Sequence, residues 1–130
     1  MNILFVETDY LLASGTVRLL QQQSGYCVNA TDRLDVVLEQ CESGRVDLVL
    51  LDAKLGPIDG QGGWAGSVEV SQQLKSNPRT AHIPIVLLAA YGLPEPGSPW
   101  LKTHRADVVF SPPMTKWGQL VEIFAHFGGL

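Results

Sequence analysis

Three acidic side chains follow the ends of two short apolar runs. Glu7 and Asp9 come just after residues 3–6, and Asp52 follows residues 48–51. If these runs are neighbouring strands of a parallel sheet, the carboxylates converge at its carboxyl edge, where such sheets bind ligands. Carboxylates that are packed together repel one another, and a divalent cation relieves this repulsion. Because oxygen ligands suit a hard ion, the three acids predict a Mg²⁺ site.

A second interpretation of these acids stays open. Acidic residues also occur at strand ends simply because the chain leaves the core there. This interpretation is weaker for Asp52, because the turn signal Pro57-Ile58-Asp59-Gly60 keeps the loop after it short.

The alternation of apolar runs with amphipathic segments predicts five strands and about five helices. Such a chain forms a parallel sheet that is covered by helices on both faces. The predicted strands are residues 3–6, 26–30, 47–52, 84–89 and 108–110. The predicted helices are residues 10–24, a segment capped by Thr31 or Asp32 that ends at Gly44, residues 67–76 capped by Ser67, residues 100–105, and a last helix capped by Thr115.

Apolar residues at helical spacing predict which side chains face the core. Spacings of three, four and seven residues place a set of side chains on one face of a helix. We also expect both cysteines and two aromatic residues in the core. The predicted core residues are Leu12, Val17, Leu19, Leu20, Tyr26, Cys27, Leu34, Val37, Leu38, Cys41, Val70, Leu74, Phe110, Trp117, Leu120, Val121 and Phe124.

Length and composition restrict the class of protein. The chain has 130 residues, which predicts a single domain over residues 1–130, and its 45% hydrophobic content is enough for a core. A net charge of −4 argues against direct nucleic-acid binding. No apolar stretch approaches the length that spans a membrane. The first residues lack the features of a secretion signal, and the two cysteines fit no zinc spacing, so we expect a cytoplasmic location.

Five segments, in order, resemble the response-regulator receiver domains of two-component signalling. They are residues 3–9, Gly25-Tyr26, residues 47–60 around Asp52, residues 83–86 and Ser111-Pro112. The resemblance covers nearly the whole chain, apart from extra residues at 61–66. It implies a flavodoxin-like (βα)5 fold, with a doubly wound parallel sheet in the strand order 2-1-3-4-5.

The resemblance also implies a function. Asp52 matches the aspartate that takes a phosphoryl group from the phosphohistidine of a sensor histidine kinase or phosphotransfer protein. Glu7, Asp52 and Asp9 would hold Mg²⁺, and the backbone carbonyl of Lys54 is the further ligand that the family offers. Metal and lysine offset the charge of the phosphoryl oxygens. Such a domain is not an enzyme; it signals to a downstream protein partner and carries no organic cofactor.

Several positions depart from the family pattern. Thr8 stands at the position of a direct metal ligand. Ala89 replaces the hydroxyl residue of the switch, Ser111 replaces the lysine, and Val108 stands at the position of the switch aromatic. These changes predict a weakened or atypical phosphorylation switch. The alternative is a pseudo-receiver that binds protein partners independently of phosphorylation.

Other classes fit less well. A phosphatase of the haloacid dehalogenase type needs a second acid two residues after the nucleophile, where this chain has Lys54. A flavin-binding flavodoxin relative needs a hydroxyl-rich phosphate loop after the first strand, whereas Glu7 and Asp9 repel phosphate. Trp64 lies among glycines and has two open roles, as an anchor for a partner or as a side chain that folds back onto the protein.

Overall fold

The computed structural model describes residues 1–7, 9–52, 66–88, 105–110 and 117–127. The elements alternate as the sequence predicts. They are β1 (Asn2–Val6), α1 (Tyr10–Ser24), β2 (Cys27–Thr31), α2 (Leu34–Glu42), β3 (Leu48–Asp52), α3 (Ser67–Ser76), β4 (Ile85–Leu88), β5 (Val108–Phe110) and α5 (Trp117–Phe127). The predicted cap Thr115 lies outside the described residues. The predicted helix at 100–105 also lies outside them, apart from Arg105.

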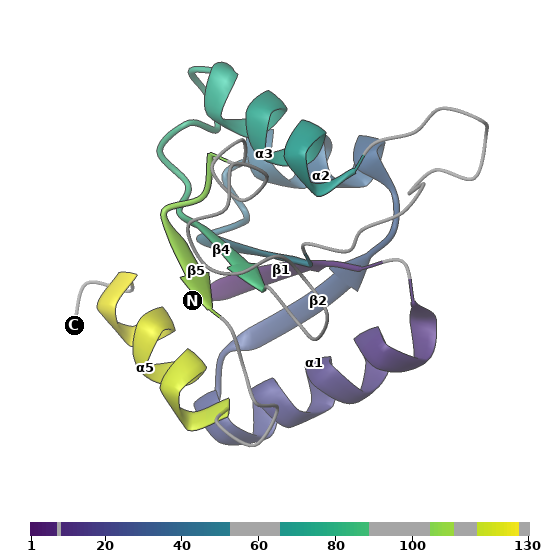
Figure 1. Cartoon of the computed structure of the whole chain (residues 1–130), viewed down its shortest axis with the longest axis vertical. Coiled ribbons are helices and arrows are strands. Elements are labelled where there is room, and N and C mark those ends of the chain that lie inside the picture. Colours follow the sequence, from purple (N-terminus) through teal and green to yellow (C-terminus); the bar gives the residue numbers. More distant parts are fainter. Residues whose placement is uncertain (8, 53–65, 89–104, 111–116, 128–130) are drawn as a thin grey trace.

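The strands form one parallel sheet of five strands in the order β2-β1-β3-β4-β5. Helices α1 and α5 cover one face of this sheet, and α2 and α3 cover the other (Figure 1). This is the doubly wound arrangement that the sequence predicts. Its strand order reverses at β1, so the carboxyl ends of β1 and β3 flank the crevice where doubly wound sheets bind ligands.

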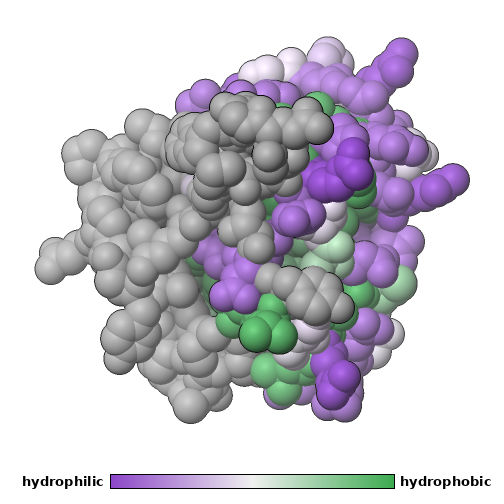
Figure 2. Space-filling model, turned by 90° about the vertical axis from the view of Figure 1, so that its right-hand side faces the viewer, coloured by the Kyte–Doolittle hydropathy of each residue, from purple (hydrophilic) through white to green (hydrophobic). Residues whose placement is uncertain are grey.

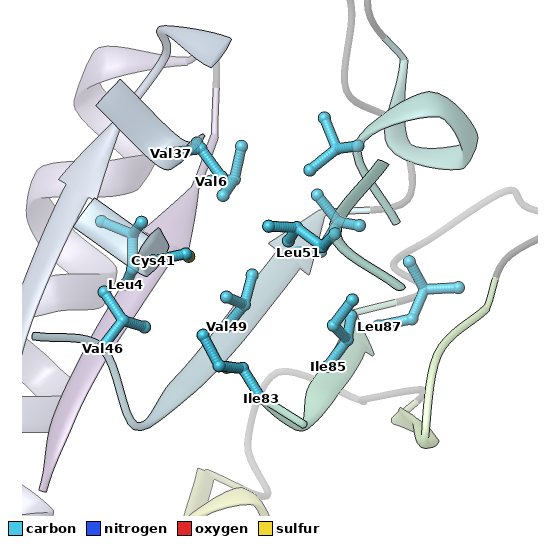
Figure 3. Close-up of a cluster of buried hydrophobic side chains, with 12 residues drawn as sticks. Leu4, Val6, Val37, Cys41, Val46, Val49, Leu51, Ile83, Ile85 and Leu87 are labelled. Atoms are coloured by element: carbon cyan, nitrogen blue, oxygen red, sulfur yellow. The ribbon is translucent and has the colours of Figure 1, made fainter. Parts of the chain in front are cut away.

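The sheet buries a hydrophobic cluster on each face. Successive side chains of a strand point to opposite faces, so Leu4 and Val6 face α2 and α3, whereas Ile3 and Phe5 face α1 and α5. Figure 3 shows the cluster beneath α2 and α3. All five residues of β3 are buried, as expected for a central strand that is covered on both faces. Predicted core residues that are buried include Leu20, Val37, Cys41, Val70, Leu74, Phe110, Leu120 and Phe124.

Helix ends follow local chemistry, with two corrections to the prediction. Helix α1 ends at Gly25, whose φ of 75° is left-handed and whose N–H donates to the Gln21 carbonyl. Helix α2 has Arg33 as its N-cap with no side-chain cap bond, so the predicted cap at Thr31 or Asp32 is wrong. The Thr31 hydroxyl instead accepts the Arg33 N–H at 3.2 Å in a turn.

The second correction concerns Ser67. The predicted cap is the first residue of α3, and the N-cap is Gly66. Serine therefore contributes no cap here, because the chain enters the helix one residue earlier than the pattern suggests.

Two residues predicted for the core lie at the surface. Leu12 has an exposed fraction of 39%, because the buried face of α1 runs through Ala13, Thr16 and Leu20. Cys27 is exposed because it begins an edge strand.

Cys41 is buried as predicted, and burial raises the pKa of its thiol to about 12. A thiol with so high a pKa is a packing residue and not a nucleophile.

A polar network joins α3, β4 and β5 at the amino edge of the sheet. The Lys75 ammonium donates to the carbonyls of Ala81 and Ile83 at 3.2 and 2.9 Å, and to Asp107 Oδ2 at 2.8 Å. The same Asp107 oxygen accepts the Ile85 N–H at 2.7 Å.

Within the described part of the chain, none of the helices is both long and apolar enough to cross a membrane.

Candidate functional site

Glu7 and Asp52 come together at the carboxyl edge of the sheet. Strand register pairs Val6 with Leu51, so the acids that follow them occupy the next position on neighbouring strands. The Glu7 N–H donates to the Thr31 carbonyl at 3.1 Å, which continues the parallel ladder one residue beyond β1. Neighbouring strands lie about 4.8 Å apart. The sequence-based prediction that β1 and β3 are neighbours is confirmed.

Strand alternation places both acids on the face covered by α1 and α5. Glu7 continues the side-chain series of Ile3 and Phe5, and Asp52 continues that of Leu48 and Leu50. Their exposed fractions are 6% and 5%. Two neighbouring carboxylates with so little access to water repel each other, and a cation placed between them favours the charged form of both. The chemistry of this pair therefore suits a divalent, oxygen-binding cation.

Asp9 lies beside this pair at the start of α1. It is the N-cap of α1, and its Oδ1 accepts the Leu12 N–H at 3.1 Å. Its own N–H donates to Glu7 Oε1 at 3.0 Å. Asp9 therefore fixes the start of α1 with its side chain and one oxygen of Glu7 with its backbone. In residues 1–7, 9–52, 66–88, 105–110 and 117–127, no three His, Cys, Asp or Glu side chains form a group that could hold a metal.

The switch positions are only partly described. Val108 is half-buried at the start of β5, where it pairs with Val86 of β4 and packs against the core cluster below α1 and α5. Ala89 and Ser111 directly follow β4 and β5 in the chain and lie outside the described residues. Thr8, Lys54 and Trp64 lie outside them too.

Sequence reasoning missed an exposed apolar side chain at the beginning of α1. Leu11 has an exposed fraction of 81%, and it follows the helix cap by two residues. The signal was present in the sequence, because the residues three, four and seven positions after Leu11 are Ser14, Gly15 and Arg18, none of which is a large apolar residue. Figure 2 shows this edge of the molecule, where hydrophilic and hydrophobic side chains lie next to each other.

Comparison with known proteins agrees with this geometry. The family model for the response regulator receiver domain matches residues 3–112. The chain therefore belongs to the receiver-domain family of two-component signalling, whose members are generally signalling modules without enzymatic activity.

Individual relatives extend the comparison. A receiver domain from Methanoculleus marisnigri is 26% identical, with a TM-score of 0.64 over 96% of this chain and 94% of that one. The receiver domain of the sensor histidine kinase PA1611 from Pseudomonas aeruginosa has 18% identity and a TM-score of 0.70 over 94% of each chain. Its structure contains a magnesium ion in the active-site cleft.

A probable cyclic di-GMP phosphodiesterase of Vibrio cholerae is 33% identical over 87 residues. The matched region is 67% of this chain but only 18% of that protein. The chain therefore corresponds to a small part of this relative.

Proposed function

We propose that residues 1–130 form a single receiver domain in which Asp52 accepts a phosphoryl group. The donor is the phosphohistidine of a sensor histidine kinase or of a phosphotransfer protein. A carboxylate oxygen of Asp52 attacks phosphorus, the phosphorus–nitrogen bond breaks, and the imidazole leaves as an acyl phosphate forms. The observation that carries this proposal is the buried pair of Glu7 and Asp52 on adjacent strand ends.

Free thiols at Cys27 and Cys41 suit a cytoplasmic location.

Mg²⁺ would be held by Asp52 and Glu7, with the Lys54 backbone carbonyl as a third ligand by resemblance. Bound there, the ion would offset negative charge on the phosphoryl oxygens. The magnesium ion in the Pseudomonas receiver domain supports this assignment. Asp9, the third acid predicted for the metal, would affect the metal through Glu7 and not as a ligand. Its Oδ1 caps α1, and its N–H orients Glu7.

The partner surface would include the start of α1. Leu11 and Leu12, with exposed fractions of 81% and 39%, lie within five residues of Glu7 in the chain. They offer apolar contact area to a protein that must bring a phosphohistidine to Asp52. A downstream effector would then read the modified domain. The Vibrio relative, a probable phosphodiesterase, is an example of a longer protein that contains a similar segment.

We further propose that the phosphorylation switch is weakened. Ala89 has no hydroxyl to donate to a phosphoryl oxygen, and Ser111 has no cationic group. Val108 has no aromatic ring to exchange between an inward and an outward position. A missing charge-assisted contact is worth about 1.5–3 kcal/mol. Phosphorylation would therefore change the surface of this domain less than in a receiver that keeps all three groups.

A titration with beryllofluoride, a phosphoryl mimic, tests this function. We expect amide NMR shifts around Glu7 and Asp52 when Mg²⁺ and beryllofluoride are both present. Ser111→Lys should strengthen beryllofluoride binding about 10- to 100-fold, the equivalent of the missing contact. Asp52→Asn provides the control without an acceptor carboxylate. The absence of shifts at millimolar Mg²⁺ would contradict the phosphoacceptor function.

Substitutions at Asp9 separate capping from metal ligation. Asp9→Asn keeps a cap oxygen, so we expect stability and Mg²⁺ affinity close to those of the wild type. Asp9→Ala removes the cap, which should lower the free energy of unfolding by about 1 kcal/mol and weaken Mg²⁺ binding severalfold. Urea denaturation and Mg²⁺ titration monitored by NMR measure these effects. A loss of Mg²⁺ affinity of tenfold or more in Asp9→Asn would instead identify the Asp9 carboxylate as a direct ligand.

The second candidate function is a pseudo-receiver that binds partners independently of phosphorylation. The substitutions at Ala89, Val108 and Ser111 favour it. It predicts that Asp52→Asn leaves partner binding unchanged. A regulatory defect in that variant would favour the phosphoacceptor instead.

A further inference from the structure

Strand β2 forms one edge of the sheet and turns part of its backbone outward. The Cys27 N–H donates to the Met1 carbonyl, and the Thr31 carbonyl accepts the Glu7 N–H, so these two residues face β1. Peptide groups of a parallel strand alternate in direction, and those of Val28 and Ala30 therefore face the outer edge. The Gln21 side-chain amide donates to the Val28 carbonyl at 3.2 Å, which agrees with this direction.

A groove lies on each side of this edge strand. The groove on the α1 side has a volume of about 490 Å³, and the groove on the α2 side has a volume of about 480 Å³. Both are lined by Asn29, Ala30 and Thr31. A strand added next to β2 would direct successive side chains to opposite faces of the sheet, and hence alternately into the two grooves. The edge also lacks the lysine or proline that often protects an edge strand from such pairing.

The two grooves differ in charge. Glu7 and Asp32 line the α1-side groove, and its described lining contains no lysine or arginine. Arg45 lines the α2-side groove, and no acid lines that groove within the described residues. A complementary strand therefore carries a basic side chain on its α1 side and an acidic side chain on its α2 side. Strand β2 itself has no charged residue. Pairing between the β2 strands of two copies would therefore place no charged side chain in either groove.

We propose that β2 is a docking edge for an extended segment of a partner protein, in which basic and acidic residues alternate. The segment pairs with the outward backbone groups of Ala30 and inserts its basic side chains towards Asp32 and its acidic side chains towards Arg45. The described lining of the two grooves does not include Asp52, although it includes Glu7 on the α1 side.

A short synthetic peptide in which lysine and glutamate alternate provides the probe. We expect it to bind the full chain with a Kd below about 1 mM, and to slow amide hydrogen exchange at Ala30. Ala30→Pro removes the outward N–H, a change that edge strands tolerate, and should weaken binding at least tenfold. Ala30→Ser keeps the N–H and should bind like the wild type.

Charge reversal at exposed Asp32 provides a second variant that does not depend on the backbone change. Asp32→Lys should weaken peptide binding severalfold and leave the beryllofluoride response intact, which separates this surface from the phosphoacceptor function. Four results would overturn the proposal. The first three are no binding at 1 mM peptide, equal binding by Ala30→Pro, and peptide-induced shifts confined to α5. The fourth is self-association of the chain that Ala30→Pro abolishes, because the occupant would then be a second copy.

Discussion

Asp52→Asn is expected to abolish phosphoryl transfer to this protein. Incubation of the wild type with acetyl phosphate and Mg²⁺ should add one phosphoryl group, detected as a mass increase of the intact chain. The asparagine variant should show none, because an amide oxygen is a poor nucleophile and forms no stable acyl phosphate. The two side chains have nearly the same shape, so the buried position at the end of β3 should stay well packed.

Asp47→Asn is the matched control. Asp47 immediately precedes β3, at the opposite end from Asp52, and its Oδ2 accepts the Asn2 N–H at 2.7 Å. Its exposed position at the amino edge leaves it far from Glu7, so this variant should be phosphorylated like the wild type. Phosphorylation that persists in Asp52→Asn would show that another residue is the acceptor. The proposed function would then fail.

Asp107→Ala is expected to cause the largest loss of stability among the polar substitutions proposed here. One oxygen of Asp107 accepts hydrogen bonds from the Lys75 ammonium at 2.8 Å and from the Ile85 N–H at 2.7 Å. The exposed fraction of the Lys75 side chain is only 12%, so removal of Asp107 leaves a nearly buried cation without its counter-charge. Asp107 is itself 38% exposed, so solvent screens part of this effect. We expect the free energy of unfolding to fall by about 2–3 kcal/mol.

Urea denaturation measures this loss as a lower midpoint with an unchanged slope. Asp35→Ala is the control, since Asp35 also forms an ion pair, with Arg33 at 2.8 Å, but both side chains are largely exposed. The Arg33 guanidinium lowers the pKa of Asp35, yet an exposed pair contributes little to stability, so the midpoint should not change measurably. Equal midpoints for the two variants would show that the Lys75–Asp107 contact adds nothing.

Asp52 and Asp107 lie at opposite edges of the sheet, the first at the carboxyl end of β3 and the second just before β5. The carboxyl edge holds the buried Glu7 and Asp52, whereas the amino edge holds the Lys75–Asp107 ion pair. Substitutions at Asp52 should therefore change phosphorylation with little effect on folding. Substitutions at Asp107 should change folding with little effect on phosphorylation of the remaining native protein.

Local patterns in the sequence were sufficient to predict the elements and the fold class. Helix α1 has the predicted limits, because Gly25 supplies the left-handed residue that ends it. Strand β3 is predictable from its run of apolar residues, which is continuous because both faces of the strand are buried. The side chains Val70 and Leu74 lie inward as helical spacing predicts. Each of these features corresponds to a pattern of nearby residues (a glycine stop, an apolar run or a helical spacing), which the sequence displays directly.

Other features were decided only by the tertiary structure. Cys27 is exposed because its strand lies at the sheet edge, and no local pattern states which strand is an edge. The role of Asp9 as a cap follows from the direction in which the chain leaves β1. The neighbouring positions of Glu7 and Asp52, and the grooves beside β2, arise from strand pairing between distant residues. Register and burial are properties of the whole sheet, and so only the folded chain determines them.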